Sequence, residues 1–122
     1  MKAMGIENQV IMTGDVDNVH EYLNMFDVFV LPSRFEGLPI SALEAQANGL
    51  TCICSENVPI VNITGGMDVT DLNKPELWVK KIISGYQRNE DYYYKLLETD
   101  FNIEKSAVKL QRIYERMGGC TR

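Results

Sequence analysis

Apolar and polar residues follow one another along the chain in two different rhythms, one typical of strands and one typical of helices. Residues 9–13 form a short apolar run that ends at a glycine, which predicts a strand. Residues 18–26 place their apolar side chains at i, i+3, i+4 and i+7, the spacing of an amphipathic helix. Residues 27–31 form a mostly continuous β-branched and aromatic run, which favours a strand buried on both faces of a parallel sheet.

The pattern continues with another helix and further strands. Pro39 suits the first helical turn, where its missing N–H would lack a partner in any case, and Gly49 suits a left-handed stop. The runs 51–55 and 60–63 predict two more strands. Three later segments have apolar residues at helical spacing: 72–87, 91–98 and 103–117. This alternation of strands and helices predicts an α/β fold with a parallel sheet and C-terminal helices.

Composition argues against several classes of function. The 122 residues suffice for one domain with a real core. The net charge of −5 argues against a nucleic-acid partner. No apolar run reaches the roughly 20 residues that span a membrane. The three cysteines and the single histidine lack the spacing of a zinc site, so we expect no metal and reduced thiols in the cytoplasm.

The strongest sign of chemistry is an isolated carboxylate. Between Gly37 and Gly49, Glu44 is the only charged side chain, and Glu36 stands eight positions before it in the preceding loop. An unpaired buried carboxylate is costly or takes up a proton, so Glu44 needs water, a partner or a ligand. Either Glu44 lies on a solvated helix face, or both glutamates bind a ligand.

The position of the two glutamates fits a nucleotide sugar. In open parallel sheets, ligands bind beyond the carboxyl ends of the strands, where residues 33–38 would lie. The next helix offers backbone N–H groups at Leu38, Ile40 and Ser41 to a diphosphate, and Gly37 lets a ligand approach closely. The first glutamate would then accept hydrogen bonds from sugar hydroxyls and the second from the ribose.

Residues 27–55 closely resemble the donor-binding segment of family 4 retaining glycosyltransferases, which have the GT-B fold. The family pattern is a strand, then Pro-Ser, Glu-Gly, Pro and a second Glu after seven intervening residues. It is met by Pro32, Ser33, Glu36, Gly37, Pro39 and Glu44. Weaker likeness extends over residues 5–115, where segments 58–64 and 78–82 resemble the subgroup that builds bacterial capsular polysaccharides and exopolysaccharides.

The resemblance implies transfer of a sugar with retention at the anomeric carbon, without an obligatory metal, from a nucleotide sugar that is usually a UDP-sugar. It also implies a lipid-linked or saccharide acceptor and a cytoplasmic location, including peripheral contact with the inner membrane face. Glu36 would be the catalytic residue that contacts the donor sugar. The other implied binding residues are Ser33, Arg34, Gly37, Leu38 and Pro39 in the loop, Glu44 at the ribose, and Thr13, Gly14 and Asp15 beside the nucleobase.

The chain departs from the family pattern in its extent. We interpret residues 1–122 as part of a Rossmann-like nucleotide-sugar-binding domain, with its first two strands and the acceptor-binding domain absent. Arg34 is the only Lys or Arg between Ala3 and Asn73, which gives little neutralisation of a diphosphate. We therefore expect the isolated chain to be inactive and at best a weak donor binder.

The missing strands also affect the sheet. In the strand order 3-2-1-4-5-6, residues 9–13 would be strand 3 and residues 27–31 strand 4, with the two absent strands between them. The chain must then pair its strands differently, leave an edge open, or close that edge in a homodimer.

Two alternatives to a glycosyltransferase fragment remain. One is a non-catalytic nucleotide-sugar-binding or interaction module that acts through a partner chain. The other is a different α/β nucleotide-binding enzyme, such as an epimerase, which the spacing of Glu36 and Glu44 around Pro39 disfavours.

Overall fold

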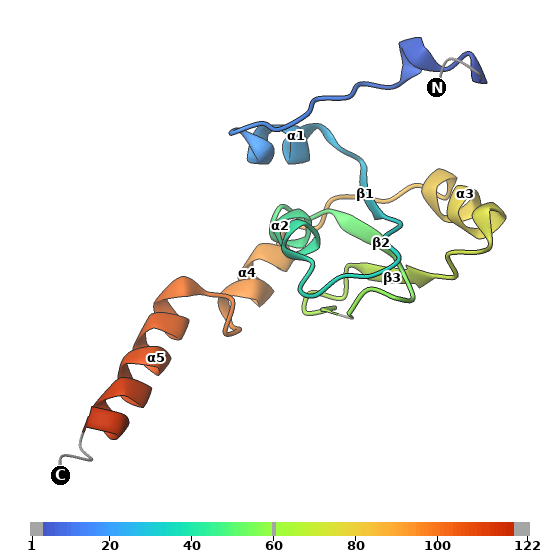
Figure 1. Ribbon diagram of the computed structural model, residues 1–122. Coiled ribbons are helices and arrows are strands. Elements are labelled where there is room, and N and C mark those ends of the chain that lie inside the picture. Colours follow the sequence, from blue (N-terminus) through green and yellow to red (C-terminus); the bar gives the residue numbers. More distant parts are fainter. Residues whose placement is uncertain (1–3, 60, 119–122) are drawn as a thin grey trace.

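The computed structural model describes residues 4–59 and 61–118 of the chain. Its regular elements, in chain order, are the short 3-10 helix η2 (Glu7–Gln9), α1 (Val19–Met25), β1 (Val28–Leu31), α2 (Ile40–Ala47), β2 (Thr51–Ser55), β3 (Met67–Thr70), α3 (Pro75–Ile83), α4 (Asp91–Leu97) and α5 (Ile103–Gly118). Figure 1 shows α2 next to the strands and α5 extending away from them toward the C-terminus.

The strands form a three-stranded parallel sheet in the order β1-β2-β3. β1 pairs with β2 from Val28 opposite Thr51 onward, and β2 pairs with β3 from Cys52 opposite Met67 onward. The predicted fold class, a partial Rossmann-like α/β domain with a parallel sheet, is confirmed. The order corresponds to strands 4-5-6 of the doubly wound pattern. Among the described residues β1 pairs only with β2, so its other edge is open within the single chain, and the homodimer stays a prediction.

The core lies between α2 and the sheet. Ala42 and Ala45 on α2 and both cysteines on β2 are fully buried, since small side chains let helix and sheet approach closely. The cluster consists of Leu23, Ala42, Ala45, Leu50, Cys52, Cys54, Val58 and Met67, with Phe29 and Leu31 packed against it. Ile53 points to the opposite face of β2 and is fully buried as well, and α3 contacts this strand.

The helix stop predicted after α2 is confirmed. Gly49 has φ +80°, the left-handed conformation that glycine adopts without steric cost. A Cβ at this position would lie 2.8 Å from the carbonyl oxygen of Asn89, so the chain leading into α4 packs directly on the glycine.

Arg88 joins the ends of two helices. Its guanidinium donates hydrogen bonds to the main-chain carbonyls of Leu23 and Phe26 at the end of α1, each at 3.0 Å. It also donates to the carbonyl of Asn48, at the end of α2. A cation at the C-terminal end of a helix interacts favourably with the helix dipole and with its unpaired carbonyls. Arg88 therefore fixes α1 against α2.

The predicted strand at residues 9–13 is wrong. Residues 10–13 have no regular structure, although Val10 has the extended angles φ −123° and ψ 126°. Ile11 and Met12 are 88% and 76% exposed. A strand needs hydrogen bonds from a neighbouring strand, and within the described residues none pairs with this segment. An apolar run of suitable composition therefore stays unpaired.

Residues 27–31 contain the predicted strand, β1, and its parallel pairing is confirmed. Its side chains are only partly buried, so the prediction of burial on both faces is wrong. The physical reason is its place at the edge of the sheet, because an edge strand lacks a neighbour and part of the cover that a central strand receives.

The strand predicted at residues 60–63 is also wrong, and β3 lies later in the chain. Residue 60 is outside the described residues, and residues 61–63 form a loop. The side chain of Asn62 pairs with the main chain of Met67, whose N–H donates to Oδ1 at 3.1 Å. Two glycines before β3 and Asp68 within it give this strand a turn-like sequence. Asp68 forms an ion pair with Lys81 of α3.

The predicted helices all form, with ends within a few residues of the predicted bounds. α5 differs from the others because none of its residues with a described side chain is buried. Its apolar residues, among them Leu110 and Tyr114, are about half exposed or more. Figure 1 shows this helix standing apart from the sheet.

Candidate functional site

The loops that follow the three strands lie at one edge of the sheet, because the carboxyl ends of parallel strands point the same way. They surround a polar hollow of about 620 Å³. It is lined by Pro32 and Arg34 after β1, Asn57 after β2, and Leu72 and Asn73 after β3. Among these, only Arg34 is a binding residue predicted from sequence. Asn73 was missed because β3 was not predicted, and Asn57 was missed because it follows the predicted strand 51–55 without belonging to a motif. This edge is where open parallel sheets bind ligands.

A chain of hydrogen bonds holds Glu36 at the same edge. The hydroxyl of Ser55, fully buried at the end of β2, donates to the main-chain carbonyl of Ser33. The hydroxyl of Ser33 donates to Oε1 of Glu36 at 2.7 Å. A charged acceptor strengthens this bond. Glu36 is half-buried, so its carboxylate is oriented by the fold itself. Sequence reasoning missed Ser55, which follows an apolar strand and carries no motif.

Gly37 occupies open space. It is exposed and lacks a positive φ, and a Cβ built on it meets no atom within 4 Å. Neither its backbone conformation nor packing among the described residues requires a glycine. Leu38, the next residue, is also exposed. The loop therefore presents a flat, accessible stretch of main chain beside Glu36.

The start of α2 has fewer free N–H groups than predicted. Pro39 has φ −77° and ψ 76°, the angles of an inverse γ-turn. This turn brings the N–H of Ile40 to the carbonyl of Leu38 at 2.9 Å, so the prediction that Ile40 offers a free N–H to a phosphate is wrong. The N–H groups of Leu38 and Ser41 remain the candidates. Pro39 itself is buried, and its carbonyl accepts the first amide of the helix ladder at 3.0 Å.

Glu44 lies in different surroundings from Glu36. It is exposed on α2, as the solvated-face alternative requires. It also borders a hollow of about 590 Å³ whose other lining residues are Asp17, Val19, His20, Leu23, Ala47, Asn48 and Tyr93. Asp17 and His20 were not predicted as site residues, because no motif includes them. The structure thus places Glu44 beside the start of α1 and Glu36 beside Ser33.

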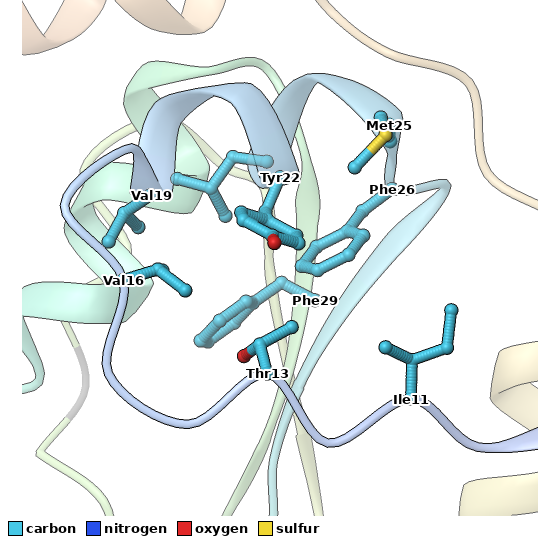
Figure 2. Close-up of a pocket in the computed structure, with 9 residues that line it drawn as sticks. Ile11, Thr13, Val16, Val19, Tyr22, Met25, Phe26 and Phe29 are labelled. Atoms are coloured by element: carbon cyan, nitrogen blue, oxygen red, sulfur yellow. The ribbon is translucent and has the colours of Figure 1, made fainter.

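The residues predicted to flank a nucleobase form an exposed turn. Gly14 has φ +65°, and Thr13 and Asp15 on either side of it are exposed. Thr13 lines a different hollow, of about 350 Å³, together with apolar side chains of α1 and β1. Figure 2 shows the rings of Tyr22 and Phe29 close to Thr13 in this hollow. Thr13 is therefore not among the residues that surround Glu44.

Within residues 4–59 and 61–118, no three or more His, Cys, Asp or Glu side chains are grouped as metal ligands would be. In the same part of the chain, no helix is long and apolar enough to cross a membrane.

Comparison with known proteins decides the family. The model of the family described as glycosyl transferases group 1 matches residues 1–88. The chain belongs to this family. The matched range includes β1, the Ser33–Glu36 loop, α2 and the sheet, which are the elements of the candidate site.

Curated relatives of the chain are bacterial glycosyltransferases. The chain is 32% identical over 114 residues to the putative glycosyltransferase EpsF of Bacillus subtilis (strain 168), covering 88% of this chain and 30% of the relative. It is 28% identical over 123 residues to UDP-Gal:alpha-D-GlcNAc-diphosphoundecaprenol alpha-1,3-galactosyltransferase of Escherichia coli, covering 91% and 31%. The O-antigen biosynthesis glycosyltransferase WclY of Escherichia coli is 25% identical over 123 residues, with 96% and 34% covered. The chain thus spans about a third of the length of these relatives.

Proposed function

We propose that this chain forms part of the nucleotide-sugar site of a retaining glycosyltransferase that uses a UDP-sugar in bacterial surface polysaccharide synthesis. Glu36 is the catalytic-site residue at the donor sugar, and residues 33–39 form the loop that holds the sugar and diphosphate. The relatives support this class of reaction, since one is named as a putative glycosyltransferase and another as an O-antigen biosynthesis glycosyltransferase.

The observation that carries the proposal is the hydrogen bond from Ser33 to Glu36 beside the open space at Gly37. A carboxylate held in one orientation makes strong hydrogen bonds to sugar hydroxyls and discriminates against a sugar that lacks them. In the described part of the chain, the other carboxylate oxygen of Glu36, Oε2, accepts no hydrogen bond and so is available to a ligand. Arg34, at the adjoining hollow, supplies a positive charge for the diphosphate.

Glu44 provides the nucleoside end of the proposed site. Its carboxylate is exposed at a hollow that also has Asp17 and His20, so acceptors and a donor for ribose hydroxyls lie together there. We keep Thr13, Gly14 and Asp15 as the turn beside the nucleobase, since only Val16 separates them from Asp17 in the chain.

The proposed donor and acceptor are based on analogy with one relative, and retention on the resemblance of residues 27–55 to retaining glycosyltransferases. The name of the Escherichia coli galactosyltransferase specifies a UDP-sugar donor and a diphosphoundecaprenol-linked acceptor. By analogy we propose a UDP-sugar donor and a lipid-linked or saccharide acceptor, which would place the protein peripherally at the inner membrane face. Because Arg34 is the only Lys or Arg between Ala3 and Asn73 in the sequence, we propose that residues 1–122 alone bind donor weakly and do not catalyse transfer.

Titration with UDP and with UDP-galactose separates the two ends of the site. Amide chemical shifts of residues 34–44 should move at millimolar UDP-galactose. Glu36→Gln should weaken UDP-galactose binding and leave UDP binding unchanged, because Glu36 contacts only the sugar. Glu44→Gln should weaken both ligands, because Glu44 contacts the ribose.

The control for these variants is Glu104→Gln on the exposed helix α5, which should leave both affinities unchanged. If no amide between residues 34 and 44 shifts at millimolar ligand, the chain has no donor site. If Glu44→Gln binds UDP as the unmodified chain does, Glu44 belongs only to the solvated helix face.

A further inference from the structure

The polar hollow at the carboxyl edge of the sheet adjoins the residue that holds Glu36. Pro32 and Arg34, the two neighbours of Ser33 in the chain, line this hollow of about 620 Å³. Ser33 itself donates the 2.7 Å hydrogen bond to the carboxylate of Glu36. The hollow at Glu44 shares no lining residue with it. The polar hollow therefore lies at the sugar end of the proposed donor site, and its volume is within the roughly 300–1,000 Å³ of small-molecule sites.

The polar side chains that line this hollow are hydrogen-bond donors without partners. They are one guanidinium and two carboxamides, from Arg34, Asn57 and Asn73, and the other lining residues are apolar. Within residues 4–59 and 61–118, the guanidinium forms no ion pair and neither carboxamide forms a hydrogen bond. Guanidinium and carboxamide groups both donate through N–H. The lining residues thus offer a positive charge and several donors, and no carboxylate.

The two carboxylates closest to these residues in the chain are bonded to the protein. Glu56, in the loop after β2, accepts the main-chain N–H of Leu72 at 2.7 Å, which ties this loop to the one after β3. Asp71 accepts the main-chain N–H of Asn73 at 2.9 Å and pairs with Lys74 at 3.0 Å. These bonds hold the rim of the hollow together. They also leave the guanidinium at the hollow without an acidic partner of its own.

We propose that the hollow binds the carboxylate of an acidic donor sugar, so that the site selects a UDP-hexuronate over a neutral UDP-hexose. This role rests on the proposed function, because Glu36 must hold the sugar beside the hollow. The carboxamides of Asn57 and Asn73 donate to the sugar carboxylate, and Arg34, which belongs to both the donor loop and the hollow, supplies the positive charge. A site built from such donors discriminates strongly against an analogue that lacks the matching acceptor.

Other ligands fit the hollow less well. The hydroxyls of a neutral hexose bind carboxamides too, but they do not compensate the charge of Arg34. A phosphate on the acceptor carries the same kind of charge as a sugar carboxylate. The hollow is connected to the donor end directly, through Ser33 between two of its lining residues, and this connection favours the donor sugar as the source of the anion.

The test compares UDP-glucuronate with UDP-glucose, which differ only in the carboxylate at C6. In residues 1–122, UDP-glucuronate should shift the side-chain NH₂ signals of Asn57 and Asn73 and bind about fivefold more tightly than UDP-glucose. The chain has a net charge of −5, so the extra negative charge of glucuronate should by itself weaken binding. A gain in affinity therefore reports a local contact.

Two variants locate that contact. Asn57→Ala and Asn73→Ala should each lower UDP-glucuronate affinity about threefold and leave UDP-glucose affinity nearly unchanged, because each removes a donor to the carboxylate only. Asn8→Ala is the matched control, since Asn8 is exposed in η2 and lines no part of this hollow. Both lining asparagines are exposed, so the variants should keep the fold, which their amide spectra would verify.

The outcomes separate this role from the donor site itself. Equal affinities for the two UDP-sugars, with amide shifts at residues 34–44, would overturn the hexuronate proposal and leave the donor site in place. No shift with either ligand would remove the donor site and this proposal with it. N-acetylglucosamine 1-phosphate probes the other anion. If it shifts the side-chain signals of Asn57 and Asn73 and UDP-glucuronate does not, the hollow takes an acceptor phosphate and the proposal is wrong.

Discussion

The hydroxyl of Ser33 donates a 2.7 Å hydrogen bond to the carboxylate of Glu36, three residues later in the same loop. Ser33→Ala removes this donor and leaves the carboxylate free to rotate. Because the bond orients a charged group, we expect UDP-galactose affinity to fall about fivefold, or roughly 1 kcal/mol. Isothermal titration would measure this loss. Ser84→Ala, which removes a hydroxyl bonded to the carbonyl of Lys81, is the matched control and should bind as the unmodified chain does. Equal affinity in both variants would contradict an orienting role for Ser33.

Replacing either of the two glycines that flank α2 with alanine should have very different effects on the free energy of unfolding. Gly49 has φ +80°, and a Cβ would meet the carbonyl of Asn89 at 2.8 Å, so Gly49→Ala should destabilise the fold by about 2 kcal/mol or more. Gly37 has open space and ordinary φ, so Gly37→Ala should change stability by less than about 0.5 kcal/mol. Urea unfolding would measure both values. A large loss for Gly37→Ala would mean that packing, not ligand access, requires this glycine.

Gly37→Ala makes a separate prediction for binding. If the main chain at this loop approaches the donor, the added methyl group should reduce UDP-galactose affinity although the fold is intact. Chemical-shift titration on the folded variant would measure it. An affinity equal to that of the unmodified chain would show that Gly37 does not contact the donor. The donor site would then be tested by the Glu36→Gln variant alone.

The sequence predicted the elements whose pattern is local and missed those that depend on neighbours. α2 was predicted from Pro39 and Gly49, and β2 from its apolar run, because capping and burial there are set by nearby residues. Residues 9–13 have the composition of a strand, but strand formation needs a partner strand, and none among residues 4–59 and 61–118 pairs with them. The same distinction holds for the candidate site: its residues within one short motif were predicted, and those brought in by the sheet were missed. Ser33 and Glu36 belong to one short motif, whereas Ser55 and Asn73 reach the edge only through the pairing of three strands.

Arg88 should contribute strongly to stability although it is exposed and belongs to no motif. Its guanidinium bonds the carbonyls that end α1 and α2, among them Leu23 at 3.0 Å. Arg88→Met keeps the apolar stem but removes all of the guanidinium's hydrogen bonds to these helix ends, so we expect a loss of about 2 kcal/mol in thermal or urea unfolding. Arg88→Lys should recover only part of it, since an ammonium lacks the forked geometry. Arg112→Met on α5 is the control, and a loss as large there would mean that charge alone is responsible.

Gln46 should be the most sensitive polar residue of α2. It is fully buried; its amide nitrogen donates to the carbonyl of Val61 at 3.0 Å, and its oxygen accepts from the hydroxyl of Thr64 at 2.9 Å. Gln46→Ala leaves the carbonyl of Val61 without this donor and the buried hydroxyl of Thr64 without an acceptor, although the hydroxyl still accepts from the N–H of Gly66 at 3.0 Å. We therefore expect a loss of about 2 kcal/mol and faster amide exchange in residues 61–66. Gln111→Ala on α5 should be neutral. Unchanged exchange in residues 61–66 would show that this loop is held by other contacts.

The two cysteines of β2 should make stability fall at alkaline pH. Burial raises the pKa of Cys52 to about 12, with a further contribution from Cys54, and raises the pKa of Cys54 to about 11. The ordinary thiol value is 9.0. Above it the unfolded chain loses protons that the folded chain still holds, so their contribution is complete below pH 9 and is lost between pH 9 and about 12. Urea midpoints measured across this range should fall less in the Cys52→Ala/Cys54→Ala variant than in the unmodified chain. An equal fall would assign the effect to other groups.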